Sequence, residues 1–367
     1  MTGFDVAVVG LGAMGSAAAY HLASRGVRVL GLDRFERGHT LASFGGRSRI
    51  IRLAYFEHPD YVPLLRAAWN GWRRLEEASG ETLLTQTGGL YAGPPDGELV
   101  AGSLRSARQH GLAHELLDAA EAMRRYPALQ LDPGWMAVLE EQAGWLAPER
   151  CIETHLRLAE RAGATLRFGA PAAVRRDGTG LAVESGGRRD AVGRVVLTAG
   201  AWLPGLLPFL APVLQVERVP LFWFEPVGHV GPLPVWIFET PDGDFYGFPP
   251  DEHGLKVARH GTGDPADPDR LDRTARAGDE ERIRAFARRH LPAADGALRS
   301  THICMYTRTP DGHFVIDRAD DHVVYASACS GHGFKFASIV GEILADLAIS
   351  GRTAHPIGFL SAARLSA

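Results

Sequence analysis

Only two of the 39 cationic side chains in this 367-residue chain are lysines, Lys256 and Lys335. All the others are arginines, so a solvent-exposed cation in this sequence is nearly always arginine. A lysine is favoured where a compact ammonium that can lose its water is needed, because a planar guanidinium does not suit such a place. Both lysines are therefore candidate functional residues.

Lys256 lies in the alternating segment GLKVARH, which predicts a β-strand. Side chains two residues apart share one face of a strand, so Lys256, Ala258 and His260 point one way and Leu255 and Val257 the other. One face then carries an ammonium and an imidazole. The residues alone leave a second interpretation open, in which this face is simply exposed to solvent.

The segment HICMYT predicts another strand, with Cys304 and Tyr306 on one face. A buried cysteine is usually a small apolar filler, and Cys151 and Cys329 are interpreted in that way. The composition of the strand cannot decide whether Cys304 is an exception.

Lys335 stands in the first turn of a predicted helix, after the turn Ser330-Gly331-His332-Gly333. A cation at a helix N-terminus opposes the helix dipole, which suggests that an anionic ligand is bound there. Arg49 and Arg52 are three residues apart and could share one face of a helix, although a solvated or structural pair is the ordinary alternative.

A dinucleotide-binding unit near the start of the chain could position these groups. The apolar run 4–9 ends in Gly10-Leu-Gly12-Ala-Met-Gly15, and a helical stretch follows before a second apolar run, 27–32, and Asp33. The glycines allow a tight turn, close approach of a pyrophosphate and close helix–strand packing, and the acid can bind a ribose hydroxyl. This carboxylate disfavours NADP, but the motif does not separate NAD from FAD.

Hydrophobic periodicity predicts the remaining elements. Helical spacing indicates helices at 60–75 and 100–126, and a second α/β unit is expected at 153–202. Alternating residues from about 217 to 310 predict an antiparallel sheet that contains a hairpin turn at Pro241-Asp-Gly243. The last segment returns to strand and helix.

That final helix has apolar positions from Phe336 to Leu347, and Gly351 ends it. The expected fold class is therefore α/β, with a Rossmann-like nucleotide-binding domain built from discontinuous segments and a substrate domain with a mainly antiparallel sheet. The predicted nucleotide-binding segments are 1–86, 142–216 and 311–367, and the predicted substrate segments are 87–141 and 217–310.

The composition excludes several classes of protein. The chain is 46% hydrophobic and 22% charged, which is typical of a globular protein. Its net charge of −4 and its lack of long basic runs argue against nucleic acid or a membrane surface as a partner. Three distant cysteines give neither a disulfide framework nor a metal-ligand pattern. With no predicted signal peptide or membrane-spanning segment, we expect a cytoplasmic enzyme.

Together these motifs resemble the monomeric sarcosine oxidase and N-methyltryptophan oxidase family of D-amino-acid-oxidase-like FAD enzymes. The similar segments run from residue 5 to beyond 340 and include VVGLGAMG with Asp33, SRIIRLAY, LTAGAW, FYGFP, GLKVARH, CMYTRTPDGHFVID and SGHGFKF. The CMYT and SGHGFKF segments are specific, whereas the glycine motif is shared with many nucleotide-binding proteins.

The resemblance implies a role for each candidate residue. It implies an FAD bound at Gly10, Gly12, Gly15, Asp33, Gly331, Gly333 and Lys335 and attached through its 8α-methyl carbon to Cys304. It implies that Arg52 and Lys335 hold the substrate carboxylate, and that Tyr246, His260 and Tyr306 line the pocket. Arg49 and Lys256 would lie near the isoalloxazine, with Lys256 at the position that activates O2, and the final helix would point its N-terminus at the flavin.

Two segments depart from the family pattern. Where the family commonly has S-H-H-G-D-T-R, this chain has Ser43-Phe-Gly-Gly-Arg-Ser-Arg49. The usual A-G-F-S-G-H-G is Ser327-Ala-Cys-Ser-Gly-His-Gly333 here. Both changes fall where the resemblance puts the cofactor.

The expected activity is oxidation of an N-methyl or cyclic secondary amino acid to an imine, which water hydrolyses to an aldehyde and an amine while O2 becomes H2O2. The substrate alternatives are sarcosine, proline or pipecolate, and N-methyl aromatic amino acids. A flavin dehydrogenase with another electron acceptor and a redox-inert nucleotide-binding module are the competing classes. The resemblance also favours a monomer.

Overall fold

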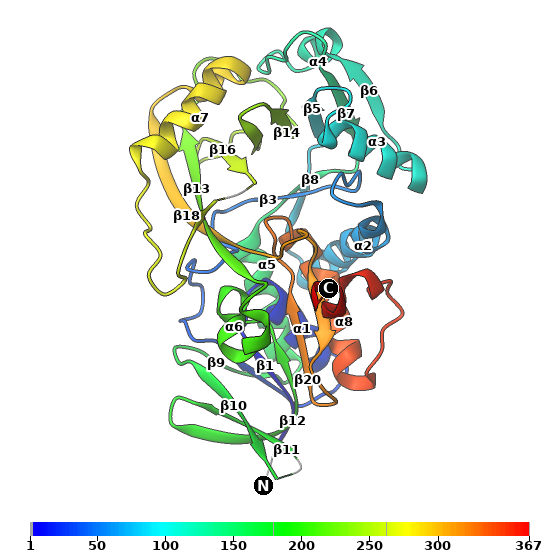
Figure 1. The fold of residues 1–367 in the computed structure, drawn as a ribbon, viewed down its shortest axis with the longest axis vertical. Helices are drawn as coiled ribbons and strands as arrows, with labels where there is room; N and C mark the ends of the chain where they lie inside the picture. The colour runs from blue at the N-terminus through cyan, green and yellow to red at the C-terminus, as the bar shows by residue number, and fades with distance from the viewer. Residues whose placement is uncertain (1–2, 179, 262, 367) are drawn as a thin grey trace.

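Two large β-sheets occupy opposite ends of the long axis of the molecule (Figure 1). The structure, a computed structural model, describes residues 3–178, 180–261 and 263–366. A small three-stranded sheet, formed by β3 (Arg49–Ile51), β8 (Gly144–Leu146) and β4 (Leu84–Gln86), lies between them. The fold is α/β, as the sequence predicts.

The first sheet has the strand order β10-β11-β12-β1-β2-β9, with β20 beside β12 and β19 beside β20. Its central strands β20, β12, β1, β2 and β9 run parallel, as a dinucleotide-binding sheet requires. The strand bounds are β1 (Phe4–Val9), β2 (Val29–Leu32), β9 (Thr165–Arg167), β10 (Ala172–Asp177), β11 (Gly180–Ser185), β12 (Arg188–Leu197), β19 (Val315–Arg318) and β20 (Val323–Ser327).

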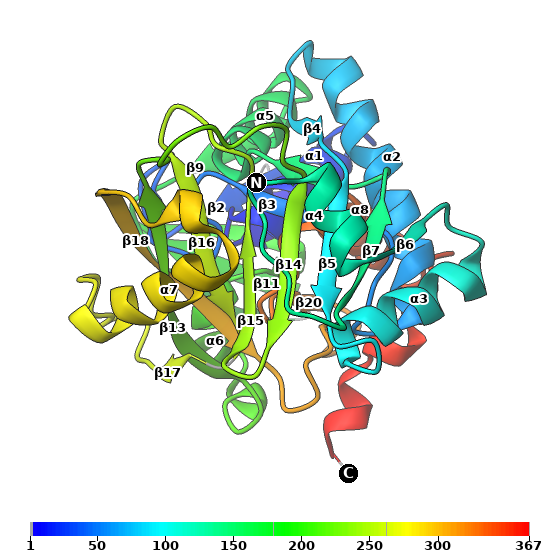
Figure 2. The ribbon, with the colours of Figure 1, turned by 90° about the horizontal axis from the view of Figure 1, so that it is seen from above.

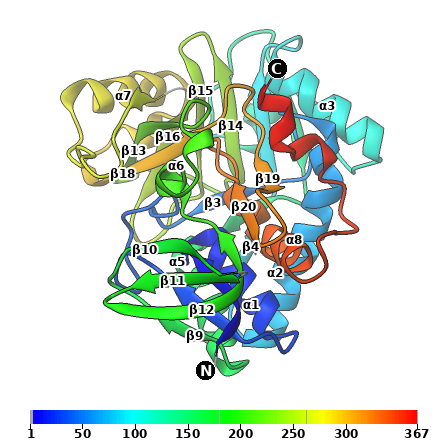
Figure 3. The same cartoon turned by 60° about the horizontal axis from the view of Figure 1, so that its bottom comes forward.

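This sheet packs against the helices α1 (Ala13–Ala23), α5 (Pro148–Arg161) and α8 (Ala337–Ser350), and α2 (Val62–Ser79) packs against α5 and α8 (Figure 3). The approach of α8 to α1 depends on Gly341, because a Cβ atom added there would lie 2.4 Å from the Cβ of Ala17. Close packing of α1 fixes its N-terminus at the glycine-rich turn.

The second sheet has the order β17-β13-β16-β15-β14-β5-β7-β6, with β18 also paired with β13. All its pairs are antiparallel except β14 with β5. The strands are β5 (Gly89–Gly93), β6 (Glu115–Asp118), β7 (Met136–Glu140), β13 (Gln215–Phe224), β14 (Val235–Thr240), β15 (Gly243–Gly247), β16 (Leu255–His260), β17 (Asp264–Pro265) and β18 (Leu298–Arg308). The hairpin predicted at Pro241-Asp-Gly243 joins β14 to β15 and is confirmed.

Helices α4 (Ala119–Arg125) and α7 (Ala277–His290) lie across the outer face of this sheet (Figure 2). Phe286 of α7 stacks on Phe245 of β15 with ring centroids 4.3 Å apart. With α7 on one face, the other face of the central strands is left to contribute residues to a cavity between the sheets. Two further helices, α3 (Glu98–His110) and the short α6 (Leu203–Leu206), flank the sheets.

Two sequence predictions about helices differ from the structure. The single helix expected at 100–126 is wrong, because Gly111 takes a left-handed conformation (φ 59°) that ends α3, and β6 comes before α4. Helix α7 also differs from the prediction, which treats the whole of 217–310 as antiparallel sheet. The two sheets are built from different segments of the chain. We therefore keep the predicted domain boundaries as a proposal, with a nucleotide-binding domain of residues 1–86, 142–216 and 311–367 and a substrate domain of residues 87–141 and 217–310.

Candidate active site

A cavity of ≈ 460 Å³ extends from the glycine-rich turn after β1 to the turn before α8. It lies where the first sheet faces β13 to β18 of the second. Twelve of the fourteen site residues predicted from the sequence line it: Gly10, Gly12, Asp33, Arg49, Arg52, Tyr246, His260, Cys304, Tyr306, Gly331, Gly333 and Lys335. Gly15 and Lys256 are not among the lining residues.

The glycine-rich turn has the geometry that a dinucleotide needs. Gly10 is left-handed (φ 92°), and a Cβ atom added at Gly15 would lie 1.7 Å from the Gly10 carbonyl oxygen. An added Cβ at Gly12 would meet only the Phe44 ring, at 3.4 Å, so the chain stays open towards the cavity. The Asp33 carboxylate accepts a hydrogen bond from the Leu11 amide at 2.7 Å, which fixes the acid beside the turn.

Cys304 lies on β18 with 2% of its surface exposed. Its thiol donates to the Ser43 carbonyl at 3.3 Å, and Nη2 of Arg49 lies 3.4 Å from its sulfur. The same guanidinium donates to the carbonyls of Ser43, Gly45 and Ser48. A positive group thus stands next to the thiol, held by the loop that precedes β3.

The expectation that Arg49 and Arg52 share a helical face is wrong, because residues 49–51 form strand β3. Both side chains nevertheless line the cavity. Arg52, at 2% exposure, donates from Nη1 to the Ala54 carbonyl and from Nη2 to both carboxylate oxygens of Glu57, each at 2.7 Å. Burial opposes ionisation of Glu57, but the Arg52 guanidinium prevails and lowers the pKa of this carboxyl to about 2.

Lys335 lies in a turn of 3₁₀ helix, Phe334–Phe336, directly before α8. Its ammonium donates to the His332 carbonyl at 2.7 Å, and the Trp72 indole donates to the Lys335 carbonyl at 2.8 Å. Burial, reinforced by the nearby Arg52 charge, lowers the pKa of Lys335 to about 7. Arg52 and Lys335 therefore place two buried cations at one end of the cavity, against the single carboxylate of Glu57.

His332 is fixed on both sides of its ring. Nε2 lies 3.0 Å from the Gly312 carbonyl, which can only accept, so this nitrogen carries the proton and Nδ1 accepts from the Tyr55 hydroxyl. Burial lowers the pKa of His332 to about 3, so the ring is neutral at physiological pH.

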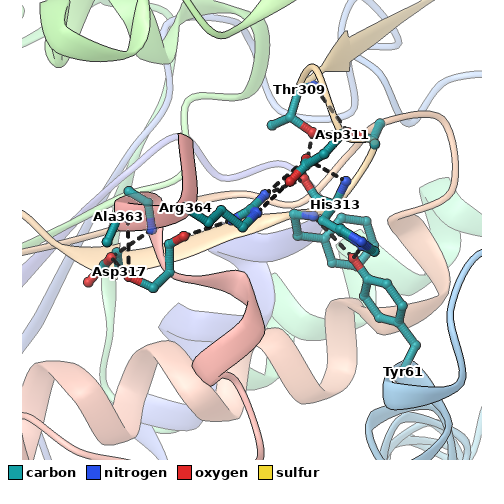
Figure 4. Close-up of polar contacts among 12 residues, drawn as sticks. Tyr61, Thr309, Asp311, His313, Asp317, Ala363 and Arg364 are labelled. Carbon is teal, nitrogen blue, oxygen red and sulfur yellow. Dashed lines mark hydrogen bonds and ion pairs between the residues drawn. The ribbon is translucent and has the colours of Figure 1, made fainter. Parts of the chain in front are cut away.

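Gly312 belongs to a turn that the C-terminal segment supports (Figure 4). Arg364 donates to the Asp311 carboxylate and to the His313 carbonyl, and the Tyr61 hydroxyl accepts from the Phe314 amide. These bonds fix the turn whose Gly312 carbonyl accepts the hydrogen bond from His332. The position of Lys335 thus depends on contacts that are far apart in the sequence.

Tyr246, His260 and Tyr306 line the middle of the cavity, on β15, β16 and β18. The His260 Nδ1 lies 3.3 Å from the Tyr306 hydroxyl, and burial lowers the pKa of His260 to about 4. A Cβ atom added at Gly331 (φ 83°) would lie 2.8 Å from the His260 ring and 2.7 Å from the Tyr306 ring. Glycine at this position lets the turn before α8 approach both rings.

Lys256 shares a face of β16 with Ala258, as predicted, but this face is buried and the alternative of a solvent-exposed face is wrong. The ammonium donates to the Gly46 carbonyl (2.7 Å), the Ser48 carbonyl (2.9 Å) and the Ser48 hydroxyl (3.1 Å). Burial, with the Arg49 charge as the next cause, lowers its pKa well below the ordinary value. The ammonium thus holds the loop that orients Arg49.

The unusual loop sequence 44–47 fits its surroundings in this chain. A Cβ atom at Gly45 would lie 2.7 Å from Nε2 of His302, and Gly46 and Arg47 both have positive φ. The Glu149 carboxylate accepts from the amides of Gly46 and Arg47. His302 lies on β18, the strand that carries Cys304, and its ring packs against this loop. A side chain at position 45 would collide with that ring, so glycine is required there. In the second departure, Ala328 and Cys329 both line the cavity.

Sequence reasoning missed Tyr55, Glu57, His332 and Glu140, which contact the predicted residues or the main chain beside them. Glu57 had a usable signal, since it follows Arg52 by five residues, and His332 lies within the SGHGFKF segment. The partners of Tyr55 and Glu140 are distant in sequence, and no spacing rule connects them.

Comparison with known proteins supports this picture. The family model described as DAO, FAD dependent oxidoreductase, matches residues 5–347. The chain belongs to this family. A monomeric sarcosine oxidase of Streptomyces avermitilis is 43% identical, with 99% of this chain and 98% of the relative covered. An N-methyl-L-tryptophan oxidase of Salmonella arizonae is 35% identical, with 94% and 95% covered.

Solved structures share the fold of this chain. NikD, an amino acid oxidase essential for nikkomycin biosynthesis, superposes with a TM-score of 0.87 at 27% identity and 98% and 97% coverage. L-Proline dehydrogenase from P. horikoshii shares the fold, with a TM-score of 0.86 at 22% identity and 99% and 98% coverage. Within the part of the chain that the structure describes, no helix is long and apolar enough to cross a membrane.

The cavity suits FAD. At one end, the bare Gly12 and the N-terminus of α1 can receive a pyrophosphate, with Asp33 beside them for a ribose. Towards the middle of the cavity, Arg49, His260 and Tyr306 surround space that also contacts the Cys304 side chain. As a member of the family, the protein is a flavoprotein oxidoreductase.

Proposed function

We propose that this protein oxidises a secondary amino acid, of the N-methyl or cyclic kind, with O2 as the electron acceptor. The observation that carries the proposal is the pair of buried cations, Arg52 and Lys335, at one end of a cavity whose other end suits FAD. Buried cations require a counter-charge, and an α-carboxylate is the anion that a small amino acid offers.

We expect substrate binding to displace Glu57 from Arg52. The guanidinium of Arg52 is committed to Glu57 in two hydrogen bonds, so a substrate carboxylate must replace at least part of that pair. Lys335, whose ammonium lies near the Tyr55 ring as the Arg52 guanidinium does, offers a second positive group. The substrate carboxylate is then held by two groups, which leaves its amine to face the middle of the cavity.

The same charges prepare the amine for reaction. Nearby cations disfavour a protonated amine, so Arg49, Arg52 and Lys335 together lower the pKa of the bound substrate ammonium. His260 is neutral at physiological pH and lies in hydrogen-bond contact with Tyr306, so these rings can orient the amine without adding charge. Bound FAD would supply the acceptor for the hydride equivalents of the substrate and would pass them to O2.

The imine that results is hydrolysed by water, so N-methylglycine would give formaldehyde and glycine. Apolar side chains of Ile50, Phe56 and Ile237 also line the cavity, beside the polar groups that would face the carboxylate and the amine. This lining also favours the alternatives of proline, pipecolate or N-methyl aromatic amino acids. A peroxide-coupled assay across these amines tests the proposal, and no peroxide from any of them would refute it.

The competing dehydrogenase function is tested in the same assay. A flavin dehydrogenase would reduce a dye rapidly while producing almost no peroxide per imine formed. We propose an oxidase because two cations, Lys256 and Arg49, lie close to the Cys304 end of the cavity and can stabilise superoxide as it forms. A purified chain without a bound yellow chromophore would instead indicate a redox-inert nucleotide-binding protein.

Covalent attachment of the flavin to Cys304 is part of the proposal. We expect Cys304→Ser to bind FAD but to release all of it into the supernatant on acid precipitation, because a hydroxyl beside Arg49 is too weak an acid to form the bond. The wild type should keep its flavin with the precipitate. Cys329→Ser, at the other thiol of the cavity, is the matched control and should retain it. Flavin that stays with the Cys304→Ser precipitate would contradict the assignment.

Carboxylate binding should depend on the protonation of Lys335. Its pKa of about 7 means that the ammonium is present below pH 7 and is lost as the pH rises through 7, while Arg52 stays charged and Glu57 stays ionised. We expect the affinity for an unreactive carboxylate such as isobutyrate to fall by about 10-fold between about pH 6 and pH 9. Calorimetric titration measures this.

The control for this pH dependence is Lys335→Met. Glu140, whose pKa burial raises to about 7, and Asp244, whose pKa burial raises to about 6, also become negative as the pH rises. In Lys335→Met, the affinity for isobutyrate should change with pH only by the smaller amount that these two carboxyl groups cause. An undiminished pH dependence in the variant would show that Lys335 does not hold the carboxylate.

We also propose that the enzyme acts as a monomer in the cytoplasm. The 43%-identical relative is named a monomeric enzyme, and three widely separated free cysteines suit a reducing compartment. Sedimentation velocity at micromolar concentration tests the first point, and a dimer would contradict it.

A further inference from the structure

We propose that Glu140 is a positioning residue for the substrate-binding arginine, Arg52. This inference rests on the proposed function, in which Arg52 holds the substrate carboxylate. Glu140 does not line the cavity and does not touch Arg52 through a hydrogen bond. It acts through the main chain next to Arg52 and through the ring of Tyr91.

The first contact is with the main chain. Glu140 ends strand β7 of the second sheet, yet Oε1 of its carboxylate accepts hydrogen bonds from the amides of Leu53 at 3.0 Å and Ala54 at 3.1 Å. These are the two residues that follow Arg52. The Ala54 carbonyl in turn accepts from Nη1 of Arg52. One carboxylate therefore fixes the segment that both carries Arg52 and binds its guanidinium.

The second contact is with an aromatic ring. Oε2 of Glu140 accepts from the Tyr91 hydroxyl at 2.8 Å, and the Arg52 guanidinium carbon lies 5.7 Å from the centre of the Tyr91 ring. The Tyr55 and Phe56 rings approach the same guanidinium at 4.3 Å and 4.6 Å. Glu140 thus holds part of the aromatic enclosure of Arg52 as well as its main chain.

The burial of Glu140 shows that these contacts are specific. Only 1% of its surface is exposed, and a buried carboxylate is stable only where its oxygens are hydrogen-bonded. Its three donors come from 53–54 and from Tyr91, which lie in different segments and are distant in sequence. A glutamate that served only the local sheet would not need to reach the residues after Arg52.

Glutamine at position 140 tests this arrangement because it keeps the shape and removes one acceptor. Its amide nitrogen must face either the two main-chain amides or the Tyr91 hydroxyl, so one side loses its acceptor. We expect Glu140→Gln to raise the Kd for isobutyrate and the KM for the best amine substrate about 10-fold. The kcat and the oxidation of the corresponding methyl ester, which lacks the carboxylate charge, should change less than about 2-fold.

Three controls make the test specific. Glu76→Gln is the matched control, since Glu76 accepts from the amides of Leu83 and Leu84 in the same manner, but no residue next to that segment lines the cavity. It should leave both constants unchanged. In an Arg52→Ala background, Glu140→Gln should have no further effect on isobutyrate binding, because the residue acts through Arg52. Tyr91→Phe, which removes one donor and keeps the ring, should weaken binding in the same direction.

The outcomes separate this inference from the proposed function. Calorimetric titration with isobutyrate does not require turnover, so it gives a result even if no amine tested is oxidised. Equal losses for the acid and its methyl ester, or additive effects of Glu140→Gln and Arg52→Ala, would show a general structural role and overturn the inference. If Glu140→Gln does not fold, unchanged isobutyrate binding in Tyr91→Phe would overturn it instead.

Discussion

Replacing Lys256 with methionine should slow the reoxidation of the reduced enzyme by O2 about 100-fold or more, while reduction by substrate changes little. The first electron transferred to O2 creates a negative charge, and the Lys256 ammonium, which donates to the same loop as Arg49, stabilises that charge in surroundings of low polarity. Methionine keeps the length and apolar contacts of the side chain but carries no charge. Stopped-flow absorbance, with the two half-reactions measured separately, gives both rates.

The contacts of Lys256 provide a second explanation that the same experiment must exclude. Its ammonium donates to Gly46 and Ser48, so losing it also loosens the loop that holds Arg49. Ser48→Ala removes one contact of this loop while leaving the ammonium, and it should leave reoxidation almost unchanged. If Lys256→Met slows both half-reactions equally, the lysine acts through the loop and its proposed role towards O2 is wrong.

The second large effect is expected at the other lysine. Lys335→Met should raise the substrate KM and the Kd for isobutyrate about 10- to 100-fold, because a charge-assisted contact with the carboxylate is lost. Reduction at saturating substrate should fall much less. Steady-state kinetics and calorimetric titration measure the two constants.

A loss of packing would give a different result from a loss of charge. Lys335 lies among Tyr55 and Phe336, so methionine preserves most of its apolar contacts. The methyl ester of the substrate serves as the internal control, and its KM should be nearly the same for wild type and variant. An unchanged KM for the acid itself would mean that the carboxylate is bound elsewhere.

Much of the fold could be predicted because its signals are local. The strand, glycine turn, helix and acid at 4–33 follow one another in the chain, and the alternation in GLKVARH places Lys256 and His260 on one strand. The scarcity of lysine by itself singles out Lys256 and Lys335, and both side chains are buried. Each of these predictions needs only the composition, neighbouring residues and the period of a strand or a helix.

The remainder could not be predicted because it depends on residues that are distant in sequence. The pair Arg49 and Arg52 suits a helix by spacing alone, and only the pairing of β3 with β8 makes the segment a strand. Glu140 reaches Leu53 across 87 positions, and His332 reaches Tyr55 across 277. The prediction for 100–126 is wrong for a local reason, since Gly111 lies within the segment and is itself a signal for a helix end.

The most direct test of the proposed oxidase function is anaerobic mixing of the purified yellow enzyme with sarcosine, proline, pipecolate and N-methyltryptophan, followed by addition of O2. We expect that at least one of these amines bleaches the flavin absorbance, that its methyl ester does so only at much higher concentration, and that O2 then restores the colour with one H2O2 per imine. Failure of every amine to bleach the flavin, or recovery of the colour by a dye but not by O2, would contradict it.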